Sequence, residues 1–342
     1  NGIYDCFYPD DDQDQADEES FCADIGSTGT CLGSVLYFCD NAGELQAYEC
    51  GTAGGGYCTW TGPGVGYDCV EPAYARPEEA PDVLLLGVSG HMKAASDLFE
   101  DANPEYLAAS GTLSAVADVY SGQGLTVHSL PYADRFYDEV LDNGEPGAYG
   151  FLSLLDDLEF AYCNWIVHCD EDGIPLGYID NPTRVVVVAH SHGCVWAHTA
   201  LWVADWAPVE ALISLDAVSM GWEGKVGGFG DNWASVILDY TEETNHEWPF
   251  AIWDPTDSWS VPGLNKLQDV EDLVPANVGV NIEVRSGGVV DFGDGEVNHR
   301  GNGSQFQIYE QKFPKEKHSK VDEVDSDALS WVLGLLGVLY GL

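Results

Sequence analysis

A run of four valines at residues 185–188 is the feature that most constrains how this chain can fold. Such an uninterrupted apolar run is typical of a strand that is buried on both faces, as in a parallel sheet. Further runs of this strand-like kind are 82–88, 125–130, 211–216, 280–286 and 305–311. Segments with helical spacing lie near 91–101, 107–120, 150–169, 192–205 and from about 324 to the end. This alternation predicts an α/β fold: a mostly parallel sheet with helices on both faces.

The residues that follow the four valines change character abruptly. They read Ala-His-Ser-His-Gly at 189–193 and lead into a predicted helix. A strand that ends in small-x-Ser-x-Gly and turns straight into a helix is the geometry of a nucleophile elbow, in which small neighbours let strand and helix approach. The turn would present the Ser191 hydroxyl at the carboxyl end of the sheet, beside helix N–H groups that can stabilise an oxyanion. A serine nucleophile needs a base, and we expect a His oriented by a carboxylate.

At these residues the chain resembles the α/β-hydrolases, and among them the secreted lipases and esterases. Three pieces within residues 82–342 carry the resemblance: "AHSHG", "LLLGVSGH" and "LISLDAV", with an Ala where the family more often has the first Gly of the elbow. The family order is nucleophile, acid, histidine, which implies Ser191, Asp216 and His318. The resemblance also implies that the backbone N–H groups of Val88 and His192 form the oxyanion hole.

Alternatives remain open for the acid and for the base. His318 follows the last predicted strand and precedes the last predicted helix, where the family places its base, whereas His299 lies in an insertion before that strand. Asp216 ends its strand directly, whereas Asp291 trails behind the next one. We therefore favour His318 and Asp216. His190 is expected to pack or to form a hydrogen bond beneath the turn.

The chain divides by composition into unequal parts. Residues 1–70 are rich in Cys, Gly and Asp, and we expect a small disulfide module there. Residues 71–81 are rich in Pro and charge, as in a linker, and residues 82–342 are expected to form the catalytic domain. An irregular insertion at 217–279 carries five Trp residues and is expected to form a cap over the site or a small core of its own.

Cysteine usage indicates export. Seven of the ten Cys residues lie in the first 69 positions, a density typical of a disulfide framework in an oxidising compartment. Zinc is disfavoured there, because the segment has no C-x-x-C pair and no His. Cys163 and Cys169 are close enough in sequence to pair. Cys194 is expected to be buried and free, with a bridge to the odd Cys of the N-terminal segment as the alternative. We therefore predict a secreted protein, extracellular or periplasmic.

The charge of the chain limits its partners. Fifty-eight acidic residues against 12 basic ones give a net charge of −46. This excludes nucleic acid, because phosphate contacts need Lys and Arg, and it disfavours an anionic membrane surface. Self-repulsion on this scale destabilises a compact fold unless salt screens it, so a salty environment is favoured over that of an ordinary acidic secreted protein.

Bound ions and membrane spans find little support in the sequence. The acidic loops at 9–20 and 291–298 are candidate calcium sites, but both fail the alternating spacing of a calcium loop, and a solvated acidic loop is favoured. No metal and no cofactor is expected at the catalytic site. No apolar stretch reaches the length of a transmembrane helix, and the apolar stretch at 328–342 is expected to close the fold as a helix.

Together these features predict a serine carboxylester hydrolase, a lipase or esterase, that acts on a small-molecule or lipid ester. Several alternatives use the same fold. They are an acyltransferase or peptidase with the same triad, a polyester-degrading esterase, and a non-catalytic binding protein whose N-terminal module is adhesive.

Overall fold

The computed structural model describes Cys22, Ile25 and the ranges 28–52, 56–90, 105–139, 147–218, 259–260, 267–268, 270–287, 297–301 and 304–341. Several predicted features lie outside these residues: the helix near 91–101, the acidic loop at 9–20, Asp291 and most of the insertion at 217–279.

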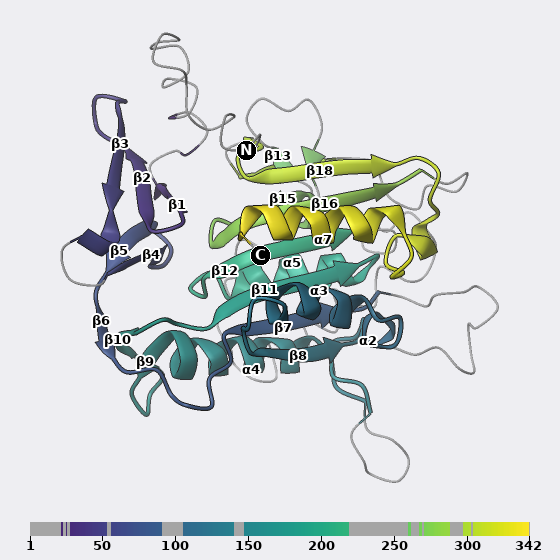
Figure 1. The fold of residues 1–342 in the computed structure, drawn as a ribbon, viewed down its shortest axis with the longest axis horizontal. Coiled ribbons are helices and arrows are strands. Elements are labelled where there is room, and N and C mark those ends of the chain that lie inside the picture. Colours follow the sequence, from purple (N-terminus) through teal and green to yellow (C-terminus); the bar gives the residue numbers. More distant parts are fainter. Residues whose placement is uncertain are drawn as a thin grey trace.

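Six parallel strands form the central sheet, in the order β18-β16-β12-β11-β7-β8 (Figure 1). Their bounds are β7 Val83–Val88, β8 Val127–Tyr132, β11 Arg184–His190, β12 Val209–Leu215, β16 Val278–Ser286 and β18 Ile308–Phe313. Every residue of β7 is buried, as are the six residues of β11 that follow its first. A strand covered on both faces has to be apolar throughout, which explains the run of valines. The predicted fold class is confirmed.

Helices cover both faces of this sheet (Figure 1). One face packs on α4 (Phe151–Ala161) and α5 (Gly193–Val203), and the other on α2 (Tyr106–Ala109), α3 (Thr112–Ser121) and α7 (Asp327–Leu339). Alternate β11 residues serve the two cores: Val185 and Val187 face α4 and α5, whereas Val186 and Val188 face the other three helices. This alternation follows from the two-residue period of a strand. It makes the sheet the middle layer of a three-layer fold.

The predicted helix at 150–169 ends early. After α4 the chain makes a π-helical turn, Tyr162–Ile166, and then enters the short strand β9, Val167–Cys169. Strand β9 pairs antiparallel with β10 (Pro175–Ile179), and β10 pairs parallel with β6 (Pro72–Tyr74), so that part of the predicted linker joins a small sheet. A disulfide between Cys163 and Cys169 closes the turn. The apolar spacing alone could not distinguish this turn from continued helix.

The N-terminal residues form two small β structures. Strands β1 (Thr30–Leu32), β2 (Val35–Cys39) and β3 (Leu45–Glu49) make an antiparallel sheet, and β4 (Tyr57–Trp60) pairs with β5 (Tyr67–Val70). Two disulfides, Cys31–Cys58 and Cys50–Cys69, connect them, and a third, Cys22–Cys39, joins Cys22 to the end of β2. Cross-links of this kind stabilise a segment too small to bury a large core. We call this segment, residues 22–70, the disulfide module.

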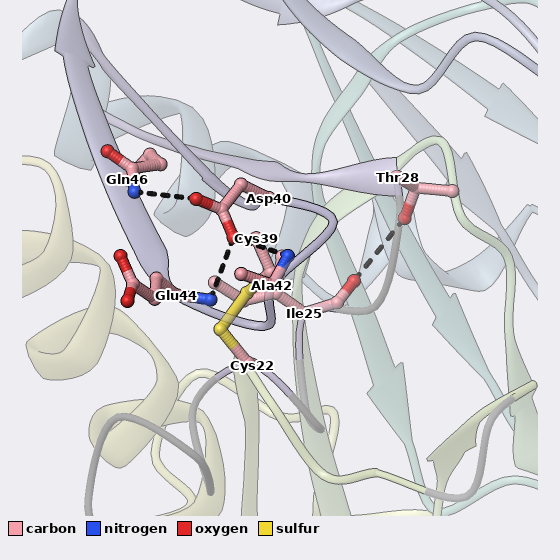
Figure 2. Close-up of a disulfide and its surroundings, with 8 residues drawn as sticks. All are labelled: Cys22, Ile25, Thr28, Cys39, Asp40, Ala42, Glu44 and Gln46. Carbon is pink, nitrogen blue, oxygen red and sulfur yellow. Dashed lines mark hydrogen bonds between the residues drawn. A yellow bond between two sulfur atoms is a disulfide. The ribbon is translucent and has the colours of Figure 1, made fainter. Parts of the chain in front are cut away.

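Figure 2 shows how one disulfide is set beside a tight turn. Asp40 follows Cys39 and accepts hydrogen bonds from the backbone N–H groups of Ala42 at 2.9 Å and Glu44 at 3.0 Å. The Gln46 side chain donates a third, at 3.1 Å. These backbone bonds lower the pKa of the exposed Asp40 carboxyl. The β2–β3 turn is thus organised by a carboxylate that satisfies its own backbone.

The disulfide module contacts the rest of the protein through specific hydrogen bonds. The Trp60 indole N–H donates to the Asp205 carbonyl at 2.7 Å, and the Tyr57 hydroxyl donates to the Ile179 carbonyl at 3.1 Å. Asp205 precedes β12 and Ile179 precedes β11. Both contacts therefore lie at the amino ends of the strands, the edge of the sheet on which the module sits in Figure 1.

The remaining short elements are β13 Trp259–Ser260, β14 Leu267–Gln268, β15 Leu273–Val274, β17 His299–Arg300 and the 3-10 turns Cys50–Thr52, Val270–Asp272 and His318–Lys320. Helix α7 begins at a defined cap, where the Ser326 hydroxyl accepts a hydrogen bond from the Leu329 N–H. Among the described residues, no helix combines the length and the apolarity that crossing a bilayer requires.

Candidate active site

Ser191 lies on a sharp turn between β11 and α5. Its φ is +57°, a left-handed conformation that is rare for residues other than Gly. Its backbone N–H donates to the Leu215 carbonyl at 3.1 Å, which fixes the turn to the neighbouring strand. A Cβ on Gly193 would lie 2.8 Å from the Ser89 carbonyl carbon, so only Gly lets α5 approach β7 this closely. The small residue predicted at this position is therefore required by packing.

Asp216 follows the adjacent strand, β12, and also has a positive φ, +51°. One oxygen of its buried carboxylate accepts the Ser286 N–H at 2.6 Å, and the other lies 2.6 Å from His318 Nδ1. Burial by itself raises the pKa of this carboxyl, but the hydrogen bonds from His318 and Ser286 together outweigh it, and the net pKa is lowered. Asp216 is therefore ionised at neutral pH.

His318 joins the other two residues. It lies in the 3-10 turn His318–Lys320, between β18 and α7, and its side chain is 18% exposed. Its Nε2 is 2.8 Å from Ser191 Oγ. Because an ionised carboxylate can only accept, Nδ1–H donates to Asp216, and Nε2 is left to accept the Ser191 hydroxyl proton. The structure thus brings together Ser191, Asp216 and His318 at hydrogen-bonding distances within the range expected of a nucleophile and its base.

The rival residues lie elsewhere or cannot be placed. His299 is in β17, in register with Leu273 of β15. Asp291 is outside the described residues. It is His318 whose ring meets Ser191 and Asp216.

The predicted oxyanion donors sit in different surroundings. His192 is the first residue after Ser191 and caps α5, so its N–H lies at a helix amino end. Val88 is the last residue of β7, in register with Ala189 and Tyr132. Gly90 lies close to Ser191, since a Cβ there would be 2.6 Å from Ser191 Cβ and 2.9 Å from His192 N. The donor role of Val88 stays a prediction.

The partner of the His192 ring was not predicted from the sequence. Its Nδ1 is 2.7 Å from an oxygen of Asp134, which also accepts the Trp196 indole N–H. Asp134 follows β8, and its side chain is 4% exposed. A carboxylate just beyond the carboxyl end of a strand could have been noticed as a candidate, because parallel strands end at the same edge of the sheet.

No grouping of His, Cys, Asp and Glu suited to a metal ion occurs among the residues that the structure describes. The polar groups at the carboxyl edge are instead hydrogen-bonded to one another. Such an arrangement can activate a serine hydroxyl through a neutral imidazole.

No family model matches the sequence, and no curated protein matches it. Among solved structures, the chain is similar to the esterase Pf2001 of Pyrococcus furiosus, with 11% identity, 75% of this chain and 81% of that chain covered, and a TM-score of 0.38. It is also similar to the esterase domain of a Rhodothermus marinus protein, with 13% identity, 90% and 96% covered, and a TM-score of 0.35. A third similar structure is Est1E from Butyrivibrio proteoclasticus, with 13% identity, 90% of this chain and 100% of that chain covered, and a TM-score of 0.34.

Proposed function

We propose that this protein is a serine hydrolase that cleaves carboxylic esters through an acyl-enzyme on Ser191. The observation that carries the proposal is the continuous hydrogen-bonded series from Asp216 through His318 to Ser191. The three residues come from three different loops at the carboxyl edge of the sheet. Their convergence as orienting acid, base and nucleophile is the arrangement that acyl transfer requires.

The reaction follows from this geometry. Ser191 Oγ attacks the ester carbonyl carbon while His318 Nε2 takes its proton. Asp216 holds the imidazole by Nδ1 and stabilises the positive charge that forms on the ring. The backbone N–H groups of His192 and Val88 bind the oxyanion. His318 then returns the proton to the leaving alcohol, and a water molecule, activated by the same base, hydrolyses the acyl-enzyme.

The substrate proposed is a small-molecule or lipid ester, and the location proposed is outside the cytoplasm. Four disulfides among the described residues support an oxidising compartment, extracellular or periplasmic. The net charge of −46 supports a salty working environment and argues against nucleic acid as a partner.

Ser191→Ala tests the proposed activity. The variant should fold like the wild type and should lose hydrolysis of a p-nitrophenyl ester, because it removes the hydroxyl that stands 2.8 Å from His318 Nε2. Ser330→Ala is the matched control, since Ser330 is an exposed residue of α7 far along the chain from the elbow. A fluorophosphonate should label the wild type and the control, but not Ser191→Ala.

Two results would overturn the proposal: full esterase activity in Ser191→Ala, or a wild-type protein that neither hydrolyses esters nor reacts with the fluorophosphonate. The second result would favour a binding protein on this scaffold. For an active enzyme, competing alcohol and amine acceptors would distinguish a hydrolase from an acyltransferase, a peptide substrate would test for a peptidase, and a series of ester chain lengths would define the acyl group.

A further inference from the structure

A buried histidine lies directly beneath the proposed base. His190 is the last residue of β11, adjacent to Ser191, and is only 3% exposed. Its ring stacks on the His318 ring with centroids 4.7 Å apart and planes 27° apart. His190 Nε2 is also 3.0 Å from the backbone carbonyl oxygen of His318. It therefore contacts the base at two points, the ring and the main chain.

The other ring nitrogen leads to a different loop. His190 Nδ1 is hydrogen-bonded to the Tyr106 hydroxyl, and that hydroxyl oxygen accepts the Gly90 N–H at 3.0 Å. Gly90 belongs to the segment after β7 that lies against Ser191 and His192. The side chains of His190 and Tyr106 thus connect the loop that carries the base with the loop beside the nucleophile.

Donor and acceptor roles in this series are determined by its ends. A carbonyl oxygen only accepts, so His190 Nε2 carries the proton and donates to His318 O. In a neutral imidazole Nδ1 is then an acceptor, so the Tyr106 O–H donates to it, while the Tyr106 oxygen accepts from Gly90. The hydrogen bonds of this series can therefore run in one direction only, from Gly90 through Tyr106 and His190 to the His318 carbonyl. A second proton on His190 would leave Nδ1–H and the Tyr106 O–H facing each other.

Burial keeps both side chains in these states. It lowers the pKa of His190 to about 4 and raises the pKa of Tyr106 well above its ordinary value. At neutral pH His190 is therefore uncharged and Tyr106 keeps its proton. His190 cannot serve as a second base, since both of its ring nitrogens are already engaged.

We propose that His190 is a positioning residue that holds the His318 imidazole against Ser191. In this proposal Tyr106 orients the His190 ring through a hydrogen bond and connects it to the segment that contains Gly90. This inference rests on the proposed function, because it assigns His190 a task in activating Ser191. Without His190 the His318 ring would be free to shift, and a base displaced by about 1 Å can lower the rate about a hundredfold. The loss of His190 should therefore slow the transfer of the proton from Ser191 to His318. Substrate binding is left unchanged.

The chain contains a closely matched control. His198, in α5, is also fully buried, and its two ring nitrogens also lie near a backbone carbonyl, Leu273 O, and a hydroxyl, Ser214 Oγ, both at 3.1 Å. Burial lowers its pKa to about 4 as well. His190→Gln and His198→Gln therefore remove the same kind of group from the same kind of surroundings. Only one of them removes the contacts with His318.

The experiment compares kcat, KM and the rate of fluorophosphonate labelling for both variants, at a temperature where circular dichroism shows both to be folded. We expect His190→Gln to lower kcat and the labelling rate together, about tenfold to a hundredfold, with KM unchanged. His198→Gln should keep the wild-type kcat, whatever stability it loses. Equal kcat losses in the two variants, or a wild-type labelling rate in His190→Gln, would overturn the inference.

Tyr106→Phe gives a second route should His190→Gln fail to fold. It removes only the hydroxyl, and its control is Tyr120→Phe, a buried tyrosine of α3 in the same apolar core. We expect kcat to fall in Tyr106→Phe alone. Adding Tyr106→Phe to a folded His190→Gln should cause little further loss, because Tyr106 acts through His190. An unchanged kcat in Tyr106→Phe contradicts the inference.

These outcomes are distinguishable from failure of the proposed function. If Ser191 is labelled in the wild type and Ser191→Ala is inactive, a normal His190→Gln variant refutes the positioning role alone. If the wild type is neither active nor labelled, the proposed function and the positioning role both fall.

Discussion

At the residue scale, backbone strain is concentrated in the proposed site. Ser191 and Asp216 are two of only four residues other than Gly with a positive φ in the part of the chain that the structure describes. They directly follow the neighbouring strands β11 and β12, where the chain turns sharply and presents a side chain at the carboxyl ends of the strands. Strain of this kind persists only where the surrounding structure holds it, here by the Leu215 and Val284 carbonyls that accept the two N–H groups.

This strain predicts a difference between two inactive variants. Ser191→Gly and Ser191→Ala both remove the hydroxyl, but only Gly adopts the left-handed conformation without cost. We expect Ser191→Gly to be the more stable of the two by about 1 kcal/mol in free energy of unfolding. Urea denaturation followed by tryptophan fluorescence would measure it. Equal stability, or a more stable Ala variant, would mean that the turn is not strained in solution.

At the element scale, the approach of α5 to β7 determines the position of Ser191. Nine of the eleven residues of α5 are buried, so the helix runs beneath the site as part of the core. Gly193 is its first residue and lies against the backbone of Val88 and Ser89. Because these neighbours are main-chain atoms, they cannot move aside as a flexible side chain would.

Two Gly→Ala substitutions should therefore have opposite effects. Gly193→Ala would force α5 away from β7, and we expect it to cost about 1–3 kcal/mol of stability and most of the proposed esterase activity. Gly334, in α7, faces open space, because a methyl group added there would have no atom within 4 Å. Gly334→Ala should raise stability by about 0.5–1 kcal/mol and leave activity unchanged, since Ala is the better helix former. Thermal unfolding and ester turnover would check both; a tolerated Gly193→Ala would contradict the packing argument.

At the scale of the whole molecule, the disulfide module and the proposed site occupy opposite edges of the sheet. The module contacts Ile179 and Asp205, which precede strands β11 and β12, whereas Ser191 and Asp216 follow those same strands. Figure 1 shows the module beyond the amino ends of the central strands. The seven residues of β11 lie between the end of the sheet that the module contacts and the end that carries Ser191. The module is therefore placed to support the fold or to bind a partner without covering the nucleophile.

The excess of acidic residues predicts a dependence of stability on salt. With a net charge of −46, folding brings like charges together, and their repulsion weakens as the Debye length falls from about 10 Å at 0.1 M salt to about 3 Å at 1 M. We expect the melting temperature to rise across that range with both NaCl and KCl. Sucrose provides the uncharged comparison, since it favours compact states without screening. A melting temperature that is flat or falls with salt would contradict the salt-adapted interpretation.

Local sequence patterns determined a large part of this fold. The apolar run of β11, the small residues on either side of Ser191 and the alternation of strands with helices are local properties, and they predicted the sheet and the turn. The predicted helix at 150–169 was too long, because the chain leaves the α-helix at Ala161, but this error was confined to one segment. The hydrophobic periodicity of a segment indicates which of its faces is buried, and it can be recognised within a single helix or strand.

Side-chain contacts between distant segments were decided only by the tertiary structure. His318 meets Asp216 and Ser191 across 102 and 127 positions, and Asp134 reaches the His192 ring across 58. The order and register of the strands set these contacts, and no local pattern encodes them. The sequence by itself thus determined the sheet and its nucleophile turn. The family resemblance implied Asp216 and His318, whereas Asp134 and the contacts of His190 with His318 and Tyr106 followed only from the packing of six strands side by side.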